Sequence, residues 1–409
     1  MSATVNSMPN KIWVLNMDDF MFKDKAFYAL KKHSLKYIQI LKPNDIAIVS
    51  PLVEKDKDFI DYTARIKKFT NKEWLLSPAK QEEGKTLVES IAQDKELLQK
   101  IKKLCKNDYV MIPLIYSDGF AKLSKKASNN LLNNAIAVSK ANDKLLFKKL
   151  CKKFDIQTIQ PAVQSEKNRK TRILRFLNFN ETYLLRRPFS AGGYGNTKGK
   201  LFDLLKKMRQ YHKEGDFYIE PFKEIYKTLG TLCMLKDDGV HFAGIDCQIV
   251  HKEAWEGCFF PFKKLDKDIL QEVEDKTMQL ASYYYSKGVR GQINFDWAIR
   301  IKNGKLLVRA LECNSRYNGF GLCLRLASAL GIPKEKLHFY LDTNIPLPAK
   351  LTTKKLISQI EKINKSLKYN GGIILTSSIK DGRAGFCFMA ENEKDVKELR
   401  SKFKKTVFA

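Results

Sequence analysis

Two short runs with the residue pattern of β-strands, joined by an Asn-Gly turn, constrain the fold of this chain more than any other feature. Residues 292–300 alternate polar and apolar side chains, residues 305–313 form a second run, and Asn-Gly stands between them at 303–304. Asn-Gly between two such runs is a strong signal for a β-hairpin, because both residues tolerate the left-handed backbone of a tight turn. We therefore expect two antiparallel strands that meet at 303–304.

Oxygen donors gather at one end of this predicted hairpin. Asp296 lies roughly opposite Glu312 in an antiparallel pair, and Asn314 follows two residues later on the same face. Carboxylate and amide oxygens suit Mg²⁺, which usually takes one or two carboxylates together with nucleotide phosphates. Arg316 stands beside them as a fixed cation for a phosphate or a carboxylate. The alternative is a solvated hairpin with scattered charges, but Glu312 closes an otherwise apolar strand, where an unpaired carboxylate is unfavourable.

This spacing resembles the metal-binding end of the ATP-grasp superfamily. The D…E-x-N-x-R pattern of that family is matched by Asp296, Glu312, Asn314 and Arg316, and a small Gly-containing stretch follows at 318–321. The resemblance implies that Asp296, Glu312 and Asn314 bind Mg²⁺, for which Mn²⁺ is the alternative. It also implies that Arg316 acts catalytically at the γ-phosphate of ATP or at an acyl phosphate.

An Asp-Lys pair before a predicted helix resembles the entry to the nucleotide site of the same family. The pair is Asp143-Lys144, the apolar stripe of the helix follows over residues 145–154, and an extended segment ends at Pro161. In the family, the lysine of this pair reaches a nucleotide phosphate, so the resemblance implies that role for Lys144. On charge alone, the alternative is a lysine on the surface of a helix.

A glycine-rich turn follows a cation-Pro pair. Arg187 and Pro188 precede the turn 190–195, whose sequence is SAGGYG. Glycines let the backbone approach a polyphosphate, and the exposed N–H groups can bind its oxygens. The family has "K-P…G-G-x-G" here, which implies that Arg187, in place of the family's lysine, binds phosphate together with Ser190, Gly192, Gly193 and Gly195.

The sequence FYIEPF at 217–222 resembles the hinge strand of the family, which implies that Glu220, Pro221 and Phe222 lie beside the adenine. Two other family positions are filled differently. An acid that binds ribose in many members would fall near 227–228, where this chain has Lys-Thr, so either Glu224 substitutes for it or ribose is held otherwise. The arginine that often stands two residues before the first metal ligand is replaced by Asn294, and Arg290 is the candidate catalytic cation on the substrate side.

The 409 residues are too many for one small domain. Over 1–135, predicted strands alternate with helices, which indicates an α/β domain with a mainly parallel sheet and resembles the pre-ATP-grasp domain. Residues 136–350 are the expected ATP-grasp nucleotide-binding and catalytic region, and 351–409 are expected to form a small α+β appendage. The fold class is therefore α/β and α+β, with an ATP-grasp fold at its centre.

The composition indicates which classes of binding partner to expect. The net charge is +29, but the lysines are spread over every helix-like segment, so we expect attraction of anionic substrates such as ATP and not a nucleic-acid partner. No apolar run is long enough to span a membrane, and the first residues lack an apolar signal region, so no membrane partner and a cytoplasmic location are expected. The eight cysteines form no C-x-x-C pair, which makes packed thiols the expectation, including Cys313 on the face opposite the metal ligands.

The resemblance implies ATP-dependent joining of a carboxylate to an amine through an acyl phosphate, with release of ADP and phosphate. The expected substrates are a small carboxylate and a small amine, such as amino acids or peptides. Two alternatives stay open at this point: another ATP-grasp reaction, such as phosphoryl transfer or modification of a protein tail, and a nucleotide-binding module without turnover or a basic nucleic-acid binder. The sequence does not identify the substrates, and it leaves the oligomeric state open, with a homodimer as one alternative.

Overall fold

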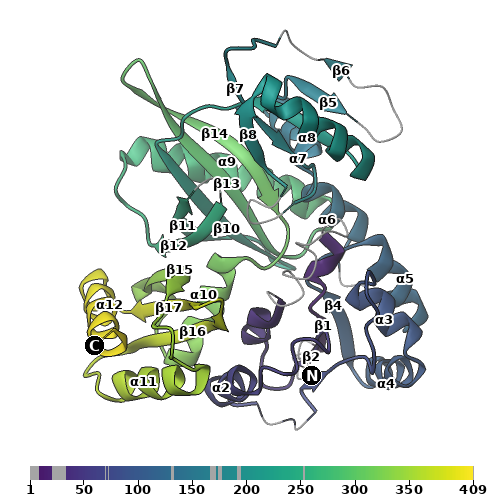
Figure 1. Ribbon diagram of the computed structural model, residues 1–409, viewed down its shortest axis with the longest axis vertical. Helices are drawn as coiled ribbons and strands as arrows, with labels where there is room; N and C mark the ends of the chain where they lie inside the picture. Colours follow the sequence, from purple (N-terminus) through teal and green to yellow (C-terminus); the bar gives the residue numbers. More distant parts are fainter. Residues whose placement is uncertain are drawn as a thin grey trace, which may run out of the picture. The chain divides into compact units, whose positions relative to one another are not determined.

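The computed structural model describes residues 9–20, 34–69, 71, 73–129, 133–165, 172–173, 177–190, 195–251 and 254–408. The chain divides into two compact units, each of which combines stretches distant in sequence (Figure 1). Unit 1 contains Met1–Ala135, Leu322–Lys336 and Thr343–Ala409, and unit 2 contains Ile136–Gly321 and Leu337–Asp342. Among the described residues, no helix is both long enough and apolar enough to cross a membrane.

A parallel sheet of the order β3-β2-β1-β4 forms the N-terminal part of unit 1. The apolar core of this part lies between the sheet and three helices. The elements are β1 (Asn10–Val14), β2 (Ile46–Ile48), β3 (Leu75–Leu76), β4 (Tyr109–Pro113), α3 (Leu87–Gln93), α4 (Lys95–Lys106) and α5 (Asp118–Lys126). Helix α3 begins where Thr86 and Glu89 exchange side-chain-to-backbone hydrogen bonds, a capping box that satisfies its first N–H groups. This arrangement confirms the prediction of an α/β domain with a parallel sheet.

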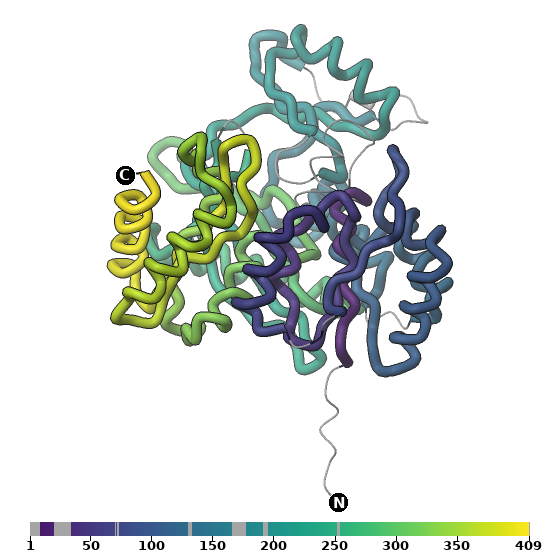
Figure 2. Tube along the Cα trace, turned by 60° about the horizontal axis from the view of Figure 1, so that its bottom comes forward, coloured from purple at the N-terminus to yellow at the C-terminus, as the bar shows by residue number. Residues whose placement is uncertain are grey.

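The C-terminal part of unit 1 is an antiparallel hairpin covered by helices. The hairpin consists of β16 (Gly371–Lys380) and β17 (Arg383–Ala390), and α11 (Thr353–Lys365) and α12 (Glu393–Val407) run side by side against it (Figure 2). The rings of Phe386 and Phe388 on β17 pack against Phe403 on α12. This is the small α+β segment that the sequence leads us to expect after residue 350.

Two buried hydrogen bonds join the N- and C-terminal parts of unit 1. Gln39 donates to the carbonyl oxygen of Leu375 at 2.8 Å, and the Leu375 N–H donates to the hydroxyl of Tyr62 at 3.1 Å. Gln39 lies on the 3-10 helix η2 (Ser34–Ile40) and Tyr62 on α2 (Lys57–Lys67). The short 3-10 helices η1 (Met17–Phe20), η3 (Ser328–Leu330) and η4 (Lys334–Lys336) complete this unit.

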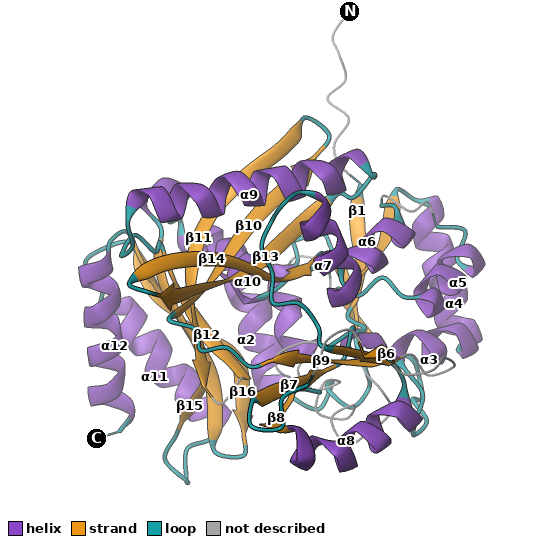
Figure 3. Cartoon of the chain, turned by 90° about the horizontal axis from the view of Figure 1, so that it is seen from above, coloured by secondary structure: helices purple, strands orange, loops and turns teal. Residues whose placement is uncertain are grey.

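Unit 2 is built on an antiparallel sheet of the order β14-β13-β10-β11-β12-β15. Its strands are β10 (Lys227–Lys236), β11 (Gly239–His251), β12 (Ala254–Phe260), β13 (Gly291–Lys302), β14 (Lys305–Asn314) and β15 (His338–Pro346), of which β15 continues into unit 1. The long helix α9 (Lys267–Ser286) lies across one face of this sheet (Figure 3). Helix α10 (Gly319–Ala327) follows β14 and begins in unit 2.

Successive residues of β13 point to opposite faces of this sheet. On the face covered by α9, Phe295 stacks with Phe147 and Tyr284, whose ring centroids lie 6.2 and 6.3 Å from its own. Cys313 pairs with Phe295 across the two strands and is buried on the same face, as the sequence predicts. Because side chains alternate along a strand, Asp296 points to the opposite face.

A second, smaller sheet in unit 2 has the order β6-β5-β9-β7-β8 and is antiparallel. Helix α8 covers one of its faces and buries Tyr183, Leu185 and Ile219 (Figure 3). Since Leu185 faces α8, its neighbour Arg186 faces away from α8. The elements are β5 (Val163–Ser165), β6 (Arg172–Ile173), β7 (Thr182–Arg186), β8 (Thr197–Lys200), β9 (Phe217–Pro221), α8 (Leu201–Glu214), α6 (Ala135–Ala141) and α7 (Lys144–Lys153).

Removal of the Phe295 ring should leave a cavity between the sheet and α9. We expect Phe295→Ala to lower the free energy of unfolding by about 3–5 kcal/mol, measured by urea denaturation. Ile301→Ala is the control on the same strand, because Ile301 is 53% exposed and its loss should change stability by no more than about 0.5 kcal/mol. Equal effects of the two variants would contradict the assignment of Phe295 to the core.

Candidate functional site

The β13–β14 hairpin brings the three predicted metal ligands together. Asp296 pairs with Glu312, and Asn294 pairs with Asn314, with a bulge directly after Asp296. The Asn314 amide nitrogen donates to Asp296 Oδ2 at 2.9 Å and to Glu312 Oε1 at 3.4 Å. Asp296, Glu312 and Asn314 therefore occupy one face at one end of the hairpin, where the bulge shifts the register of the Asn-Gly turn by one residue and brings Glu312 opposite Asp296.

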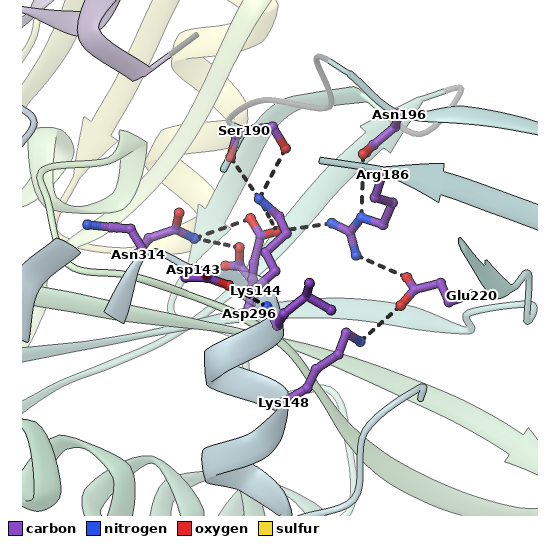
Figure 4. A network of polar contacts seen from close by, with 12 residues as sticks. Asp143, Lys144, Lys148, Arg186, Ser190, Asn196, Glu220, Asp296 and Asn314 are labelled. Atoms are coloured by element: carbon purple, nitrogen blue, oxygen red, sulfur yellow. Dashed lines mark hydrogen bonds and ion pairs between the residues drawn. The ribbon is translucent and has the colours of Figure 1, made fainter. Parts of the chain in front are cut away.

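Two buried cations converge on Glu312 from other elements. Lys144, the first residue of α7, places Nζ 3.3 Å from Glu312 Oε2, and Arg186 at the end of β7 places Nη2 3.0 Å from the same oxygen. Lys144 Nζ also donates to the carbonyl oxygen of Ser190 at 2.8 Å and to its hydroxyl at 3.1 Å (Figure 4). The predicted residues Lys144, Ser190 and Glu312 thus meet at one point, together with Arg186.

The ion pairs continue from Arg186 into the β9 strand. Arg186 Nη1 lies 3.1 Å from Glu220 Oε1, and Lys148 Nζ lies 2.9 Å from Glu220 Oε2 (Figure 4). Lys148 and Glu220 are each only 2% exposed. The Glu220 side chain therefore forms ion pairs with two cations. Pro221 is the last residue of β9, and the Phe222 N–H donates to the Thr182 carbonyl at 2.8 Å.

Arg187, the predicted phosphate ligand, points away from this cluster. Its guanidinium donates to the carbonyl oxygens of Tyr211 at 2.8 Å and Asp216 at 3.2 Å, and it forms an ion pair with Glu214 on α8. Because neighbouring side chains leave β7 on opposite sides, only one member of the Arg-Arg pair can face the cluster, and that member is Arg186. Gly192 and Gly193 lie outside the described residues, and Gly195 adopts a φ of +73° beside the Arg187 side chain.

Arg290 also lies elsewhere than expected. Its Nη1 donates to the carbonyl oxygens of Tyr285 and Val289, both at 3.0 Å, and its guanidinium lies over the Tyr285 ring. This position is the C-terminal end of α9, before β13 begins at Gly291. About 20 Å of strand separates it from Asp296, and a role of Arg290 on the substrate side stays a prediction.

Arg316 is held beside the metal hairpin by an asparagine that the sequence analysis did not single out. Arg316 Nη1 donates to Asn142 Oδ1 at 3.3 Å and to Asn314 Oδ1. The Ser315 N–H donates to the same Asn142 oxygen at 3.0 Å. Asn142 thus connects the segment that precedes Lys144 to the end of β14. Its place directly before the Asp-Lys pair is the signal that could have found it.

Sequence reasoning missed two more polar residues on the site face, both on β11. The Gln248 amide donates to Asp296 Oδ1 at 2.6 Å, so amide groups occupy both oxygens of Asp296. Asp246 is 2% exposed and accepts a hydrogen bond from the Gly230 N–H at 2.8 Å. Gly230 pairs with Asp246 on one side and with Asp296 on the other. Lys148 and Arg186 could have been found, because one lies a helical turn after Lys144 and the other adjoins Arg187.

The two carboxylates at the centre have opposite electrostatic environments. Burial alone would raise the pKa of Glu312, but the charges of Lys144, Arg186 and Arg316 lower it to about 2. Burial and the neighbouring Glu312 charge raise the pKa of Asp296 well above its usual value. Burial lowers the pKa of Lys144 to about 8. The cations around Glu312 thus favour its ionised form, whereas burial and the Glu312 charge oppose a second negative charge on Asp296.

This donor set fits a hard divalent cation. The described residues contain no group of three or more His, Cys, Asp and Glu side chains able to hold a metal ion. A cation here would be held by the Asp296 and Glu312 carboxylates and by the Asn314 amide, with its remaining ligands from outside the protein, as is usual for Mg²⁺ at nucleotide sites. Asn314 directs its nitrogen to the carboxylates and its oxygen to Arg316, so its amide must turn over to serve as a ligand.

Substitution of each carboxylate by its amide should change stability in opposite directions. We expect Glu312→Gln to lower the free energy of unfolding by about 3–5 kcal/mol at pH 7, because Lys144 and Arg186 lose a charged partner. Asp296→Asn should raise it by about 1 kcal/mol in metal-free buffer, since a crowded negative charge is removed. Urea denaturation measures both changes.

The Glu312→Gln effect should also depend on pH. The lowered folded-state pKa of about 2, against an ordinary 4.5, gives a stabilisation that is present above about pH 4.5 and is lost as the pH falls toward 2. The difference between the wild type and Glu312→Gln should therefore shrink over that range. A difference that stays constant down to pH 2 would contradict the assigned ion pairs.

Comparisons with known proteins find similarity in structure and not in sequence. No protein-family model matches the chain, and no curated protein matches it. An N5-carboxyaminoimidazole synthase from Aspergillus clavatus, solved with ADP and an aminoimidazole ribonucleotide, is 12% identical with a TM-score of 0.59, covering 98% of this chain and 99% of that one. Biotin carboxylase from Campylobacter jejuni is 14% identical with a TM-score of 0.60, covering 96% and 90%. An N5-carboxyaminoimidazole synthetase from Staphylococcus aureus is 11% identical with a TM-score of 0.56, covering all of both chains. At such identities the likeness concerns the fold, and with the two sheets and the hairpin described above it shows that this chain has the ATP-grasp fold.

Proposed function

We propose that this protein is an ATP-dependent carboxylate–amine ligase that forms an amide or peptide bond through an acyl phosphate and releases ADP and phosphate. The observation that carries the proposal is the convergence of Lys144, Arg186, Glu312 and Asp296 at one buried point of an ATP-grasp fold. The names of the similar structures, which are those of a synthase, a synthetase and a carboxylase, support ligase chemistry in general. The formation of an amide or a peptide is the more specific part of the proposal.

The proposed reaction has two steps. A carboxylate oxygen attacks the γ-phosphorus of ATP, the bond from that phosphorus to the bridging oxygen breaks, and ADP leaves. The amine nitrogen then attacks the carbonyl carbon of the acyl phosphate, the bond from this carbon to the phosphate oxygen breaks, and phosphate leaves as the nitrogen loses a proton. Negative charge develops on phosphate oxygens in both steps, so fixed cations contribute most of the stabilisation.

The positions of three cations of this chain support that assignment. Lys144 and Arg186 approach the same oxygen of Glu312, so a phosphate oxygen beside Glu312 comes within reach of both. Burial keeps the two side chains in a medium where their charges act strongly. Arg316, fixed by Asn142 and Asn314, is the candidate for the acyl phosphate or the γ-phosphate. The Ser190 hydroxyl accepts a hydrogen bond from Lys144 at the same point.

Mg²⁺, or Mn²⁺ in its place, would be held by Asp296, Glu312 and Asn314. When bound, such an ion neutralises the charge on phosphate oxygens. The chain's own contribution is the alignment of these ligands: Gln248 binds one oxygen of Asp296, and Lys144 and Arg186 bind one oxygen of Glu312. The nucleotide base is proposed at the end of β9, beside Glu220, Pro221 and Phe222.

A panel of substrates tests the proposal directly. We expect the protein to release ADP and phosphate when Mg²⁺, ATP, a carboxylate and an amine are all present, and mass spectrometry should detect the condensed product. The carboxylates should begin with bicarbonate, since two of the similar structures form a carboxyamino group by name. Glu312→Gln should lower turnover by at least about 100-fold. ADP release that needs no amine and leaves no condensed product would favour simple phosphoryl transfer instead.

The Arg-Arg pair offers a matched comparison of neighbours. Arg186→Met should raise the ATP concentration for half-saturation about tenfold or more, because a phosphate-facing cation is lost. Arg187→Met should leave it within about threefold, since Arg187 faces α8. Steady-state kinetics at saturating Mg²⁺, after a check that each variant is folded, measures both. A larger ATP effect at Arg187 than at Arg186 would overturn the proposed phosphate role.

A further inference from the structure

The site face of β13 continues beyond Asp296 as a row of buried amides. Side chains alternate along a strand, so Asn294 and Gln292 share the face of Asp296. Asn294 is 1% exposed and Gln292 is 6% exposed. The row begins about 7 Å from Asp296 along the strand. Both residues are polar where a buried strand would normally carry apolar residues, so each amide needs hydrogen-bonding partners.

This row lies on the far side of Asp296 from the proposed nucleotide base. The other end of β13 runs beside residues 224–226, because Arg300 Nε donates to the Glu224 carbonyl at 3.1 Å and the Tyr226 N–H donates to the Ile299 carbonyl at 2.8 Å. Residues 224–226 closely follow the end of β9, where the base is proposed. A molecule that meets Asn294 therefore approaches Asp296 from the side opposite the base.

No described residue donates a hydrogen bond to the carboxamide oxygen of Asn294 or of Gln292. The Asn294 nitrogen donates to the Thr231 carbonyl at 2.7 Å, and since a carbonyl can only accept, this bond fixes which way the amide points. Within the part of the chain that the structure describes, no donor reaches Asn294 Oδ1 or Gln292 Oε1. A buried acceptor without a donor is unfavourable, and such groups are rare in folded proteins.

The Gln292 carboxamide occupies space that only a glycine leaves free. A Cβ built on Gly321 would lie 1.9 Å from Gln292 Oε1 and 2.6 Å from its Cδ. The amide thus lies directly over the backbone at the start of α10, a few residues after Arg316. Because residue 321 has no side chain, the Gln292 carboxamide has room at this position within the site.

The two carboxamide oxygens of this row favour a ligand that donates hydrogen bonds. Both oxygens are neutral acceptors, and the side chains of Asp246 and Asp296 add further carboxyl oxygens to the same face. A carboxylate would meet only acceptor oxygens of these amides here, whereas an N–H group would satisfy them. We propose that Asn294 and Gln292 form the amine subsite of this protein, in which their carboxamide oxygens accept hydrogen bonds from an ammonium or amide N–H group of the second substrate. This inference rests on the proposed function and names a substrate class for that site.

Two other glutamines provide matched controls. Gln39 and Gln359 also carry buried carboxamide oxygens that no described residue donates to, but both belong to unit 1. Gln39, like Asn294, fixes its nitrogen on a backbone carbonyl. If unsatisfied amide oxygens were only a packing feature, replacement of any of these glutamines by methionine would change the binding affinity for ligands equally.

Binding of two probe series tests the subsite on the full chain. Amino acid amides have an ammonium group and no carboxylate, and N-acetyl amino acids have a carboxylate and no ammonium group. We expect isothermal titration calorimetry, with and without ADP and Mg²⁺, to detect binding of members of the amide series in preference to their N-acetyl counterparts. Gln292→Met and Asn294→Ala should each weaken that binding about tenfold. Gln39→Met and Gln359→Met should leave it within about twofold.

Gly321→Ala is a second variant that leaves both amides in the sequence. Its methyl group should displace the Gln292 carboxamide, which is the flexible end of a side chain, and should weaken binding of the amide series as Gln292→Met does. Preference for the N-acetyl series, binding of neither series, or unchanged binding in Gln292→Met and Gly321→Ala would each overturn the proposal. The proposed function fails in a different way, when amino acid amides bind but no carboxylate and amine together yield ADP.

Discussion

The Glu312 carboxylate, held between Lys144 and Arg186, is the interaction on which the rest of the site depends. One of its oxygens receives both cations, which come from α7 and from β7, while Glu312 itself lies two residues before the end of β14. The smaller sheet, the α7 helix and the hairpin are therefore joined by charge at a single buried point. Glu220 extends the same pattern by pairing with Arg186 and Lys148. Such networks are favourable only when every member is paired, so they specify one geometry strongly.

Because side chains alternate along β13, one face of this strand packs in the core and the other face carries the polar residues of the site. Phe295 faces α9 and stacks with the rings that hold the sheet to its helices. Asp296, Asn294 and Gln292 face the other way and carry the polar groups. A shift of one residue in register would move every one of these side chains to the wrong face, so the packing of the core also fixes the position of the site.

The sequence predicts the hairpin because its turn signal is local. Asn-Gly sets the register next to the turn, and a β-bulge directly after Asp296 then shifts the pairing by one residue, so that Asp296 lies opposite Glu312 and not Leu311. The choice between Arg186 and Arg187 is not local, since it depends on which face of β7 is covered by α8. The position of Arg290 is not local either: its distance from Asp296 follows from where α9 ends, which spacing to a family motif does not reveal. Gln248 and Asp246 come from β11, nearly 50 residues before Asp296, and only the strand order β13-β10-β11 brings them to the site.

The shared oxygen of Glu312 makes binding of nucleotide and of metal thermodynamically linked under the proposed function. A phosphate that draws Lys144 and Arg186 toward itself leaves Glu312 with less compensation, and a divalent cation restores it. Conversely, a cation bound to Glu312 releases the lysine and the arginine for the phosphate. Because such coupling is reciprocal, each ligand must raise the affinity of the other by the same factor. Cooperativity of this kind needs no movement of domains; it follows from two cations and one carboxylate that exchange partners.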